Sequence, residues 1–361
     1  MPRKILILTN NSGGLYCFRR ELIAELIKTN EVIASTPFDD KINELENMGC
    51  QLIQTEFERR GINPIKDLAL LLTYDELIRA EKPDLVITYT IKPNIYGGMI
   101  CRKRRIPYAV NITGLGTVFE NQGYLRKLVV SMYRLALKKA GVVYFENSSN
   151  LQVLLSERIL KIDQACLLNG AGVNLDYFSL QPYPQNSKLK FLFVGRIMRE
   201  KGIDELFAAM KMLIEDGVNC SLDVLGGFDE DYSRTIKEYE EEGWLKYHGY
   251  QTDVRPFIRD CDCFVLPSWH EGMANTNLEC AASGRPVITS NISGCKEAVI
   301  DGVSGLLCKP KDADSLYEAM KRMINISRSG RQAMGMAGRK HMEEIFDKRK
   351  VVEQTVEHLI N

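Results

Sequence analysis

No apolar run in the 361-residue chain approaches the roughly 20 residues that a membrane-spanning helix needs. The first residues, Met1-Pro2-Arg3-Lys4, lead directly into a predicted strand and do not have the pattern of a secretory signal. From these two absences we expect a cytoplasmic protein.

Paired cysteines are also lacking. The ten cysteines are scattered singly, and no two of them form a Cys-x-x-Cys motif. Even Cys261 and Cys263, the most closely spaced pair, fall at the entry to a predicted strand. We therefore expect reduced cysteines in the core, with neither disulfides nor a metal site.

Two common nucleotide-binding patterns do not occur. Neither Gly-x-Gly-x-x-Gly nor Gly-x-x-x-x-Gly-Lys-Ser/Thr is present anywhere in the chain. The sequence therefore gives no indication of NAD or ATP chemistry.

The 47 basic and 47 acidic residues cancel, but the balance hides a basic segment. Nine basic residues lie between Arg102 and Lys139, against the single acid Glu120. Within it, Tyr124 to Lys139 has the pattern of a basic amphipathic helix. Two interpretations stay open: a core helix with a solvated basic face, or a surface for anionic lipid or a phosphate-bearing acceptor. No recognised nucleic-acid motif accompanies the charge, so we expect no nucleic-acid partner.

The length favours two domains of ordinary size. Short apolar strands alternate with helix-like segments, which predicts mostly parallel sheets with helices on both faces. A polar, proline-rich stretch, Ser179 to Lys190, predicts the linker. The predicted domains are 1–180 and 190–345, with a terminal helix, 346–361, that packs back on the first domain. Predicted strands are 4–9, 31–37, 50–55, 84–90, 108–113 and 142–146, then those near 191–194, 221–225, 264–266, 287–289 and 306–308.

The first strand of the second domain ends in Gly195-Arg196, and Lys201 follows before a helix predicted from about Ile203. Glycine permits close approach of a ligand to the backbone, and two positive charges at the carboxyl end of a strand suit a diphosphate. The alternative is a surface salt-bridge cluster with Glu200.

The stretch from Phe264 to Ser283 is the predicted centre of the active site. A buried strand ends at Pro267, and a helix is predicted from Met273 to Ala282. The start of such a helix points unpaired N–H groups at ligands beyond the strand, which makes an anion site. Glu271 and Glu279 lie eight residues apart, so they suit opposite ends of an elongated ligand. The alternative is that both are ordinary helix charges.

Strands of the first domain also end in polar turns, where such folds keep their ligands. Gly13-Gly14 is predicted as a turn before a helix beginning near Leu15, and Gly14 would let a ligand approach the backbone. We expect acceptor contacts from Lys92 and Asn94, in the loop after strand 84–90. The alternative is that these residues belong to plain connecting turns.

Together these motifs resemble those of the retaining glycosyltransferases of family 4, which have two doubly wound, Rossmann-like domains facing across a cleft, the GT-B fold. The resemblance covers essentially the whole chain. It depends on the order of four motifs: Gly13-Gly14, Gly195-Arg196…Lys201, Glu271-x7-Glu279 and the helical tail.

The resemblance implies a role for each of the matching residues. Arg196 and Lys201, beside Gly195, would bind the donor's diphosphate and support it as a leaving group, which a divalent metal does in other transferases. Glu271 would contact the donor sugar, and Glu279 would accept hydrogen bonds from the ribose. Backbone N–H groups at the helix start would hold sugar and phosphate, namely those of Gly272, Met273, Ala274 and Asn275. No cofactor is implied beyond the nucleotide-sugar donor.

The loop segments look more like those of bacterial enzymes that extend lipid-linked oligosaccharides for capsule, O-antigen or glycoprotein glycans. That resemblance implies a UDP-activated hexose or N-acetylhexosamine, an acceptor on polyprenyl diphosphate, and a place at the inner face of the membrane. Many relatives carry a histidine in the first domain, where this chain has Lys92 or Asn94. Its histidines are His248, His270, His341 and His358.

Three other functions stay open on the sequence alone. A transferase acting on a soluble sugar acceptor would carry the same motifs. A UDP-N-acetylglucosamine 2-epimerase shares the fold, but the first domain lacks an acid and histidine set for proton abstraction. A non-enzymatic sugar-nucleotide sensor is disfavoured by the joint presence of Arg196, Lys201, Glu271 and Glu279.

Overall fold

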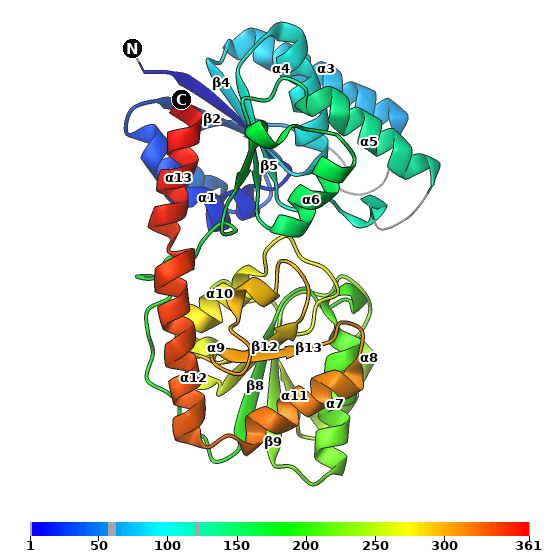
Figure 1. Ribbon diagram of the computed structural model, residues 1–361, viewed down its shortest axis with the longest axis vertical. Helices are drawn as coiled ribbons and strands as arrows, with labels where there is room; N and C mark the ends of the chain where they lie inside the picture. Colours follow the sequence, from blue (N-terminus) through cyan, green and yellow to red (C-terminus); the bar gives the residue numbers. More distant parts are fainter. Residues whose placement is uncertain (1, 57–62, 120–122, 361) are drawn as a thin grey trace. The chain divides into compact units, whose positions relative to one another are not determined.

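The computed structural model describes residues 2–56, 63–119 and 123–360. The chain forms two α/β units, one made of Met1–Ala171 with Arg349–Asn361 and the other of Gly172–Lys348 (Figure 1). Each unit contains one sheet, and all its strands are parallel. This confirms the predicted fold class of two doubly wound parallel sheets.

The sheet of the first unit has seven strands in the order β3-β2-β1-β4-β5-β6-β7. Its strands are β1 (Lys4–Leu8), β2 (Glu31–Thr36), β3 (Gln51–Gln54), β4 (Leu85–Tyr89), β5 (Tyr108–Ile112), β6 (Val142–Phe145) and β7 (Ala165–Leu167). Its helices are α1 (Ser12–Ile27), α2 (Ile42–Asn47), α3 (Pro64–Glu81), the π-helix η1 (Pro93–Gly97), α4 (Gly98–Arg104), α5 (Tyr124–Leu137), α6 (Ser148–Ser156) and α13 (Lys348–Ile360).

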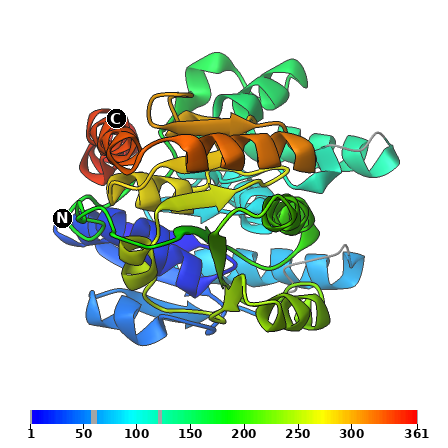
Figure 2. The same cartoon turned by 90° about the horizontal axis from the view of Figure 1, so that it is seen from below.

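The sheet of the second unit has six strands in the order β10-β9-β8-β11-β12-β13. Its strands are β8 (Leu189–Val194), β9 (Cys220–Leu225), β10 (Leu245–Tyr247), β11 (Cys263–Leu266), β12 (Val287–Ser290) and β13 (Gly305–Cys308). Its helices are α7 (Ile203–Glu215), α8 (Ser233–Glu241), α9 (Arg255–Asp260), α10 (Asn275–Ala282), α11 (Ala313–Asn325) and α12 (Arg328–His341), and Figure 2 shows helices on both sides of the sheet.

Successive side chains of the central strands point to opposite faces of the first sheet, and both faces are covered by helices. Leu6 and Leu8 pack under α3, α4, α5 and α6, whereas Ile5 and Ile7 pack under α1 and α2. The helix α13 covers the latter face too, because Val352, Val356 and Leu359 pack on it. Tyr144 fixes α13 further by donating a hydrogen bond of 2.7 Å to the carbonyl of Thr355.

The polar segment 179–190 lies in the second unit and is bound to it by arginine side chains. The fully buried Arg285 donates to the carbonyls of Gln181 and Pro182, and Arg328 donates to those of Tyr183 and Pro184. Carbonyl oxygens bound in this way to charged donors give strong local anchoring. The chain therefore passes between the units at Ala171/Gly172 and again at Lys348/Arg349.

Two helix starts differ from the prediction. The helix α1 begins at Ser12 rather than near Leu15, because the Asn11 side chain caps it by accepting from the N–H of Gly14. Gly13 and Gly14 therefore lie in the first helical turn, not in a turn before it. The helix α10 begins at Asn275, two residues later than predicted.

Candidate functional site

In a parallel sheet of this kind, ligands bind beyond the carboxyl ends of the strands where the strand order reverses. In the second unit the reversal falls between β8 and β11, because β9 follows on one side of β8 and β11 on the other. Gly195, Arg196 and Lys201 follow β8, and Glu271 follows β11. The fold therefore brings both predicted motifs to one switch point, which we call the donor-side switch point after the prediction that the donor binds there.

The loops after β8 and β11 are joined by an ion pair between Lys201 Nζ and Glu271 Oε1. Ser268 donates a second bond, of 2.8 Å, to the same carboxylate oxygen. Only 19% of the Lys201 side chain and 12% of the Glu271 side chain are exposed. Because surrounding protein replaces most of the solvent, this pair is held in one geometry rather than screened as a surface pair would be.

Glycines allow the backbones around this point to touch. Gly202 has φ of 73°, and a Cβ there would overlap the carbonyl of Pro267, at the end of β11. Gly226, after β9, has φ of 141°, and a Cβ there would overlap the carbonyl of Gly195. Side chains at either position would separate the strand ends.

Arg196 pairs with Asp229, with 2.7 Å between Nη1 and Oδ2, and 55% of its side chain is exposed. Glu200 instead lies 3.4 Å from Nε2 of His270. The two cations that were predicted to bind a diphosphate thus have separate carboxylate partners, and neither partner is the Glu200 of the alternative interpretation. Arg196 is the more accessible of the two.

The start of α10 is braced by a turn that follows β12. The N–H of Ala274 donates to the carbonyl of Gly294 at 2.7 Å, so this predicted ligand donor is already bonded within the protein. Gly294 has φ of 90°, and a Cβ there would lie 2.5 Å from the carbonyl oxygen of Glu271 and 2.7 Å from that of Gly272. Gly294 therefore fixes the course of the Glu271 loop.

The remaining predicted donor-site residues lie just before α10 or within it. Met273 is buried, whereas Gly272 and Asn275 are partly exposed. Glu279, in the second turn of the helix, is also partly exposed. Their contacts with a donor stay a prediction.

The sequence did not single out Ser268, Asp229 or Gly294 as site residues. The short spacing Ser268-x-x-Glu271 is a local signal that could have been used, because it lets the two side chains meet. Asp229 and Gly294 carry no such signal, because they reach the site only through the sheet order.

The first unit has a matching reversal between β1 and β4, which we call the acceptor-side switch point after the prediction that the acceptor binds there. After β1, the first turn of α1 is already occupied by protein groups. Ser12 donates its N–H to Asp39 Oδ1 at 3.1 Å, and the N–H of Gly14 is bonded to Asn11. Close approach of a ligand to Gly14 therefore stays a prediction.

Lys92 and Asn94 follow β4 but have different surroundings. Lys92 Nζ lies 2.9 Å from Asp67 Oδ1, and 15% of the Lys92 side chain is exposed. Asn94 is 1% exposed; its amide accepts from Thr88 at 2.7 Å and donates to the carbonyl of Asn111 at 2.8 Å. These bonds connect β4 and β5, and an acceptor contact from Asn94 would require them to open.

Several basic side chains of segment 102–139 are bonded to residues of the first unit. Residues 120–122 of this segment lie outside the described residues. Four of its arginines bond to the carboxylates or carbonyls of neighbours, namely Arg102, Arg104, Arg126 and Arg134. Lys127, Lys138 and Lys139 are exposed. The predicted amphipathic helix is present as α5.

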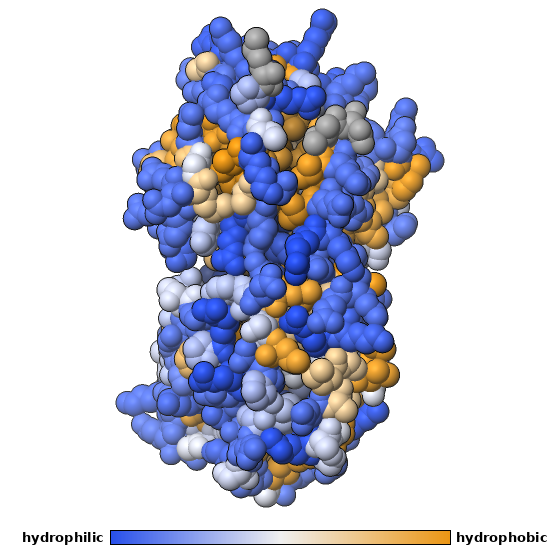
Figure 3. Space-filling model, turned by 90° about the vertical axis from the view of Figure 1, so that its left-hand side faces the viewer, coloured by the Kyte–Doolittle hydropathy of each residue, from blue (hydrophilic) through white to orange (hydrophobic). Residues whose placement is uncertain are grey.

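Three further observations concern the described part of the chain. None of its helices is both long and apolar enough to cross a membrane. No group of three His, Cys, Asp or Glu residues in it is placed to hold a metal ion. Figure 3 shows one face on which hydrophilic residues predominate and hydrophobic ones gather in patches.

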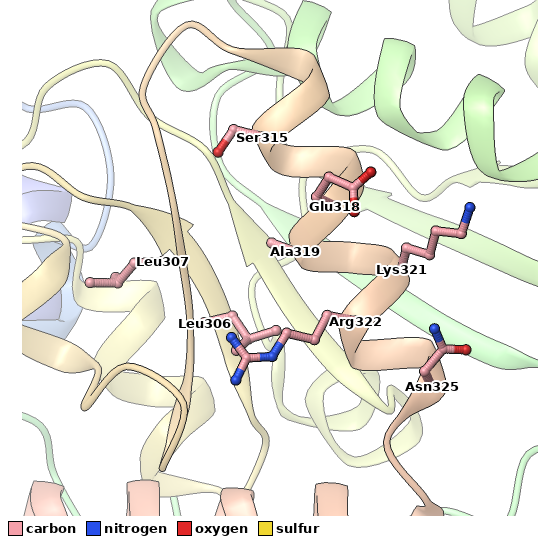
Figure 4. Close-up of a pocket in the computed structure, with 8 residues that line it drawn as sticks. All are labelled: Leu306, Leu307, Ser315, Glu318, Ala319, Lys321, Arg322 and Asn325. Atoms are coloured by element: carbon pink, nitrogen blue, oxygen red, sulfur yellow. The ribbon is translucent and has the colours of Figure 1, made fainter.

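A hollow on the second unit is lined by polar residues of α11, among them Glu318 and Arg322, and by Leu306 of β13 (Figure 4). It lies beside the edge strand of the sheet, away from the β8/β11 reversal. It contains none of the predicted site residues.

Comparison with known proteins agrees with this two-part arrangement. Residues 4–147 match the family model described as glycosyl transferase 4-like, and residues 181–341 match that of glycosyl transferases group 1. The chain is 29% identical over 341 residues to the N,N'-diacetylbacillosaminyl-diphospho-undecaprenol alpha-1,3-N-acetylgalactosaminyltransferase of Campylobacter jejuni, covering 89% of each chain. It is 28% identical over 287 residues to the UDP-Gal:alpha-D-GlcNAc-diphosphoundecaprenol alpha-1,3-galactosyltransferase of Escherichia coli, covering 74% of this chain and 73% of that one.

A solved glycosyltransferase from Rickettsia africae has the same fold, with a TM-score of 0.80 at 19% identity over 99% of this chain and 98% of that one. The two family models and the two relatives confirm the predicted enzyme class, a glycosyltransferase. The chain belongs to the glycosyltransferases of the GT-B fold, with a 4-like first half and a group 1 second half.

Proposed function

We propose that this enzyme transfers a hexose or N-acetylhexosamine from a UDP-sugar, with retention of configuration, to a hydroxyl of a glycan carried on polyprenyl diphosphate. The observation that carries the donor site is the Lys201–Glu271 pair at the donor-side switch point. It places a cation and a carboxylate together where the fold presents ligands.

The charges at this point suit the bond that breaks. As the anomeric carbon separates from the diphosphate oxygen, negative charge grows on the diphosphate, and Arg196 and Lys201 would stabilise it. Glu271 would hold hydroxyls of the donor sugar, and Glu279 those of the ribose. Attack by the acceptor hydroxyl on the face that the diphosphate leaves, with the hydroxyl proton passing to the departing diphosphate oxygen, would retain the configuration.

The relatives support the choice of substrates. Both are named as alpha-1,3 transferases acting on sugars linked to undecaprenyl diphosphate, and one name specifies UDP-galactose. The acceptor would lie at the acceptor-side switch point, near Lys92.

A transfer assay tests this proposal. The purified enzyme is incubated with UDP-sugars and with undecaprenyl-diphosphate-linked or soluble sugar acceptors, and products are analysed by mass spectrometry and NMR. We expect an alpha-linked product on a lipid-linked acceptor, with or without EDTA. Transfer only to soluble acceptors would replace the lipid-linked assignment, and conversion of UDP-N-acetylglucosamine without any acceptor would indicate the epimerase.

We further propose that the first turns of α3 and α5 rest on an anionic membrane. On α3, the exposed Ile65, Leu68 and Leu72 form a stripe opposite the buried face. On α5, no residue before Val130 is buried, and Leu125 and Leu128 are exposed. Both helices pack on the same face of the sheet (Figure 1).

Exposed apolar stripes next to exposed lysines, here Lys66 and Lys127, suit the boundary between lipid headgroups and acyl chains. We expect the enzyme to sediment with phosphatidylglycerol vesicles, and the double change Leu125→Ser and Leu128→Ser to reduce binding about tenfold or more. Val303→Ser, at an equally exposed position of the second unit, is the control. Equal binding by both variants would contradict this surface.

A further inference from the structure

The ion pair between Lys92 and Asp67 lies at the acceptor-side switch point and is largely shielded from solvent. Lys92 follows β4, and Asp67 lies in the first turn of α3. Only 15% and 11% of the two side chains are exposed. Replacing such a pair by apolar groups is often neutral or stabilising, so stability alone does not account for it.

Tyr96, in the π-helix η1, lies near Asp67. Burial, and after it the charge of Asp67, raise the pKa of Tyr96 to about 12, so the phenol stays protonated. Short π-helices are frequent at functional sites because they re-aim side chains. Here η1 brings Tyr96 near the carboxylate that pairs with Lys92.

Thr90, two residues before Lys92, is a second and independent sign of a ligand. Its φ is 72°, which is strained for a β-branched residue. Its hydroxyl oxygen is buried and has no hydrogen-bond partner among the residues that the structure describes. Buried hydroxyls are rarely left so, and strain of this kind collects where ligands bind.

The charges of Lys92 and Asp67 decide which ligand the pair suits. A diphosphate needs excess positive charge, whereas Lys92 is matched by one carboxylate at 2.9 Å. An ammonium and a carboxylate side by side offer one donor and one acceptor. A neutral sugar ring with neighbouring hydroxyls can use both.

We propose that Lys92 and Asp67 form a subsite for the hydroxyls of the acceptor's sugar ring, with Lys92 donating to one hydroxyl and Asp67 accepting from its neighbour. The inference depends on the proposed transfer to a sugar acceptor, and it distinguishes this subsite from whatever binds the acceptor's diphosphate.

Steady-state kinetics with the acceptor varied at saturating donor tests the subsite. Lys92→Met and Asp67→Asn should each raise the KM for acceptor about tenfold or more, because each removes a hydrogen bond to a charged group. The KM for donor and the melting-point shift caused by UDP should not change. Asp67→Glu, which keeps the charge, should recover part of the loss.

The matched control is Asp75→Asn. Asp75 lies on the same helix and pairs with Arg104, with 2.6 Å between Oδ2 and Nη2, but away from the strand ends. It should leave both KM values unchanged.

Acceptors lacking single ring hydroxyls complete the test. One of these acceptors should lack the hydroxyl to which Lys92 donates. For that acceptor the wild-type enzyme and Lys92→Met should have equal KM values, because Lys92 then has no hydroxyl to bind. Unchanged acceptor KM in both variants, or an equal rise for Asp75→Asn, would overturn the subsite. If a substituted protein fails to fold, Lys92→Arg is measured instead and should raise the KM severalfold. Absence of transfer by the wild-type enzyme to every acceptor would instead refute the proposed function.

Discussion

Each unit has a sheet in which the strand order reverses once, between β8 and β11 in the second unit and between β1 and β4 in the first. At the donor-side switch point the two loops bond directly to each other. Lys201 pairs with Glu271, and the N–H of Trp269 donates to the carbonyl of Glu200 at 3.0 Å. The strand ends themselves are in backbone contact through glycine.

At the acceptor-side switch point the side chains of the two loops bond to residues on other elements of the first unit. Ser12 bonds to Asp39 after β2, Lys92 to Asp67 on α3, and the bonds of Asn94 run to β4 and β5. The same topology thus supports a site whose loops bond to each other in one unit and one whose loops are anchored separately in the other. The first arrangement suits a nucleotide that many enzymes share, and the second suits acceptors that differ from one enzyme to the next.

The largest expected effect comes from removing the link between the two donor-side loops. Lys201→Met should lower turnover by about 10²–10³-fold, because a cation is lost where charge develops on the diphosphate. Release of UDP in the presence of acceptor measures it. Lys190→Met is the control, since Lys190 lies 3.7 Å from Asp223 at the opposite end of β8 and should change turnover little. Equal losses in the two variants would remove the distinction.

A second prediction concerns the backbone contact at the same point. Gly226→Ala should destabilise the second unit by about 2–3 kcal/mol, because its Cβ would overlap the carbonyl of Gly195 and its φ is 141°. Gly227→Ala has open space and should be nearly neutral. Chemical denaturation of the two variants measures this difference in stability, and equal unfolding midpoints would contradict the prediction.

A smaller effect is expected from the bond that Ser268 makes to Glu271. Ser268→Ala should reduce kcat/KM by about tenfold, the low end of the contribution of one hydrogen bond to a carboxylate. Ser268→Thr should restore most of it. Ser233→Ala, which removes a bond of 2.6 Å to Asp231 at the exposed start of α8, should leave the rate unchanged. Loss in the Ser233 variant would indicate a general effect on folding.

Much of the fold follows from local pattern. The long, buried strands were predicted within a few residues because their apolar runs end at glycine, proline or polar turns. The strands β7 and β10 were not predicted. Each has three residues and a place at the edge of its sheet, which is too short for a periodic signal.

The site follows from the sequence less completely. Arg196, Lys201 and Glu271 were placed at strand ends correctly, but their partners were not foreseen. Asp229 and Gly294 come to the site through the order of strands, which local pattern does not encode. The start of α10 was wrong for a similar reason, since a bond from Ala274 to the distant Gly294 turns the chain before the helix begins.

The measurement that tests the central claim most directly is calorimetric titration of UDP into the wild-type protein, Lys201→Met and Lys92→Met. If the nucleotide binds at the donor-side switch point, Lys201→Met should weaken UDP binding about tenfold or more, and Lys92→Met should bind UDP as the wild type does. Loss of UDP binding in Lys92→Met with normal binding in Lys201→Met would contradict the assignment of the two sites.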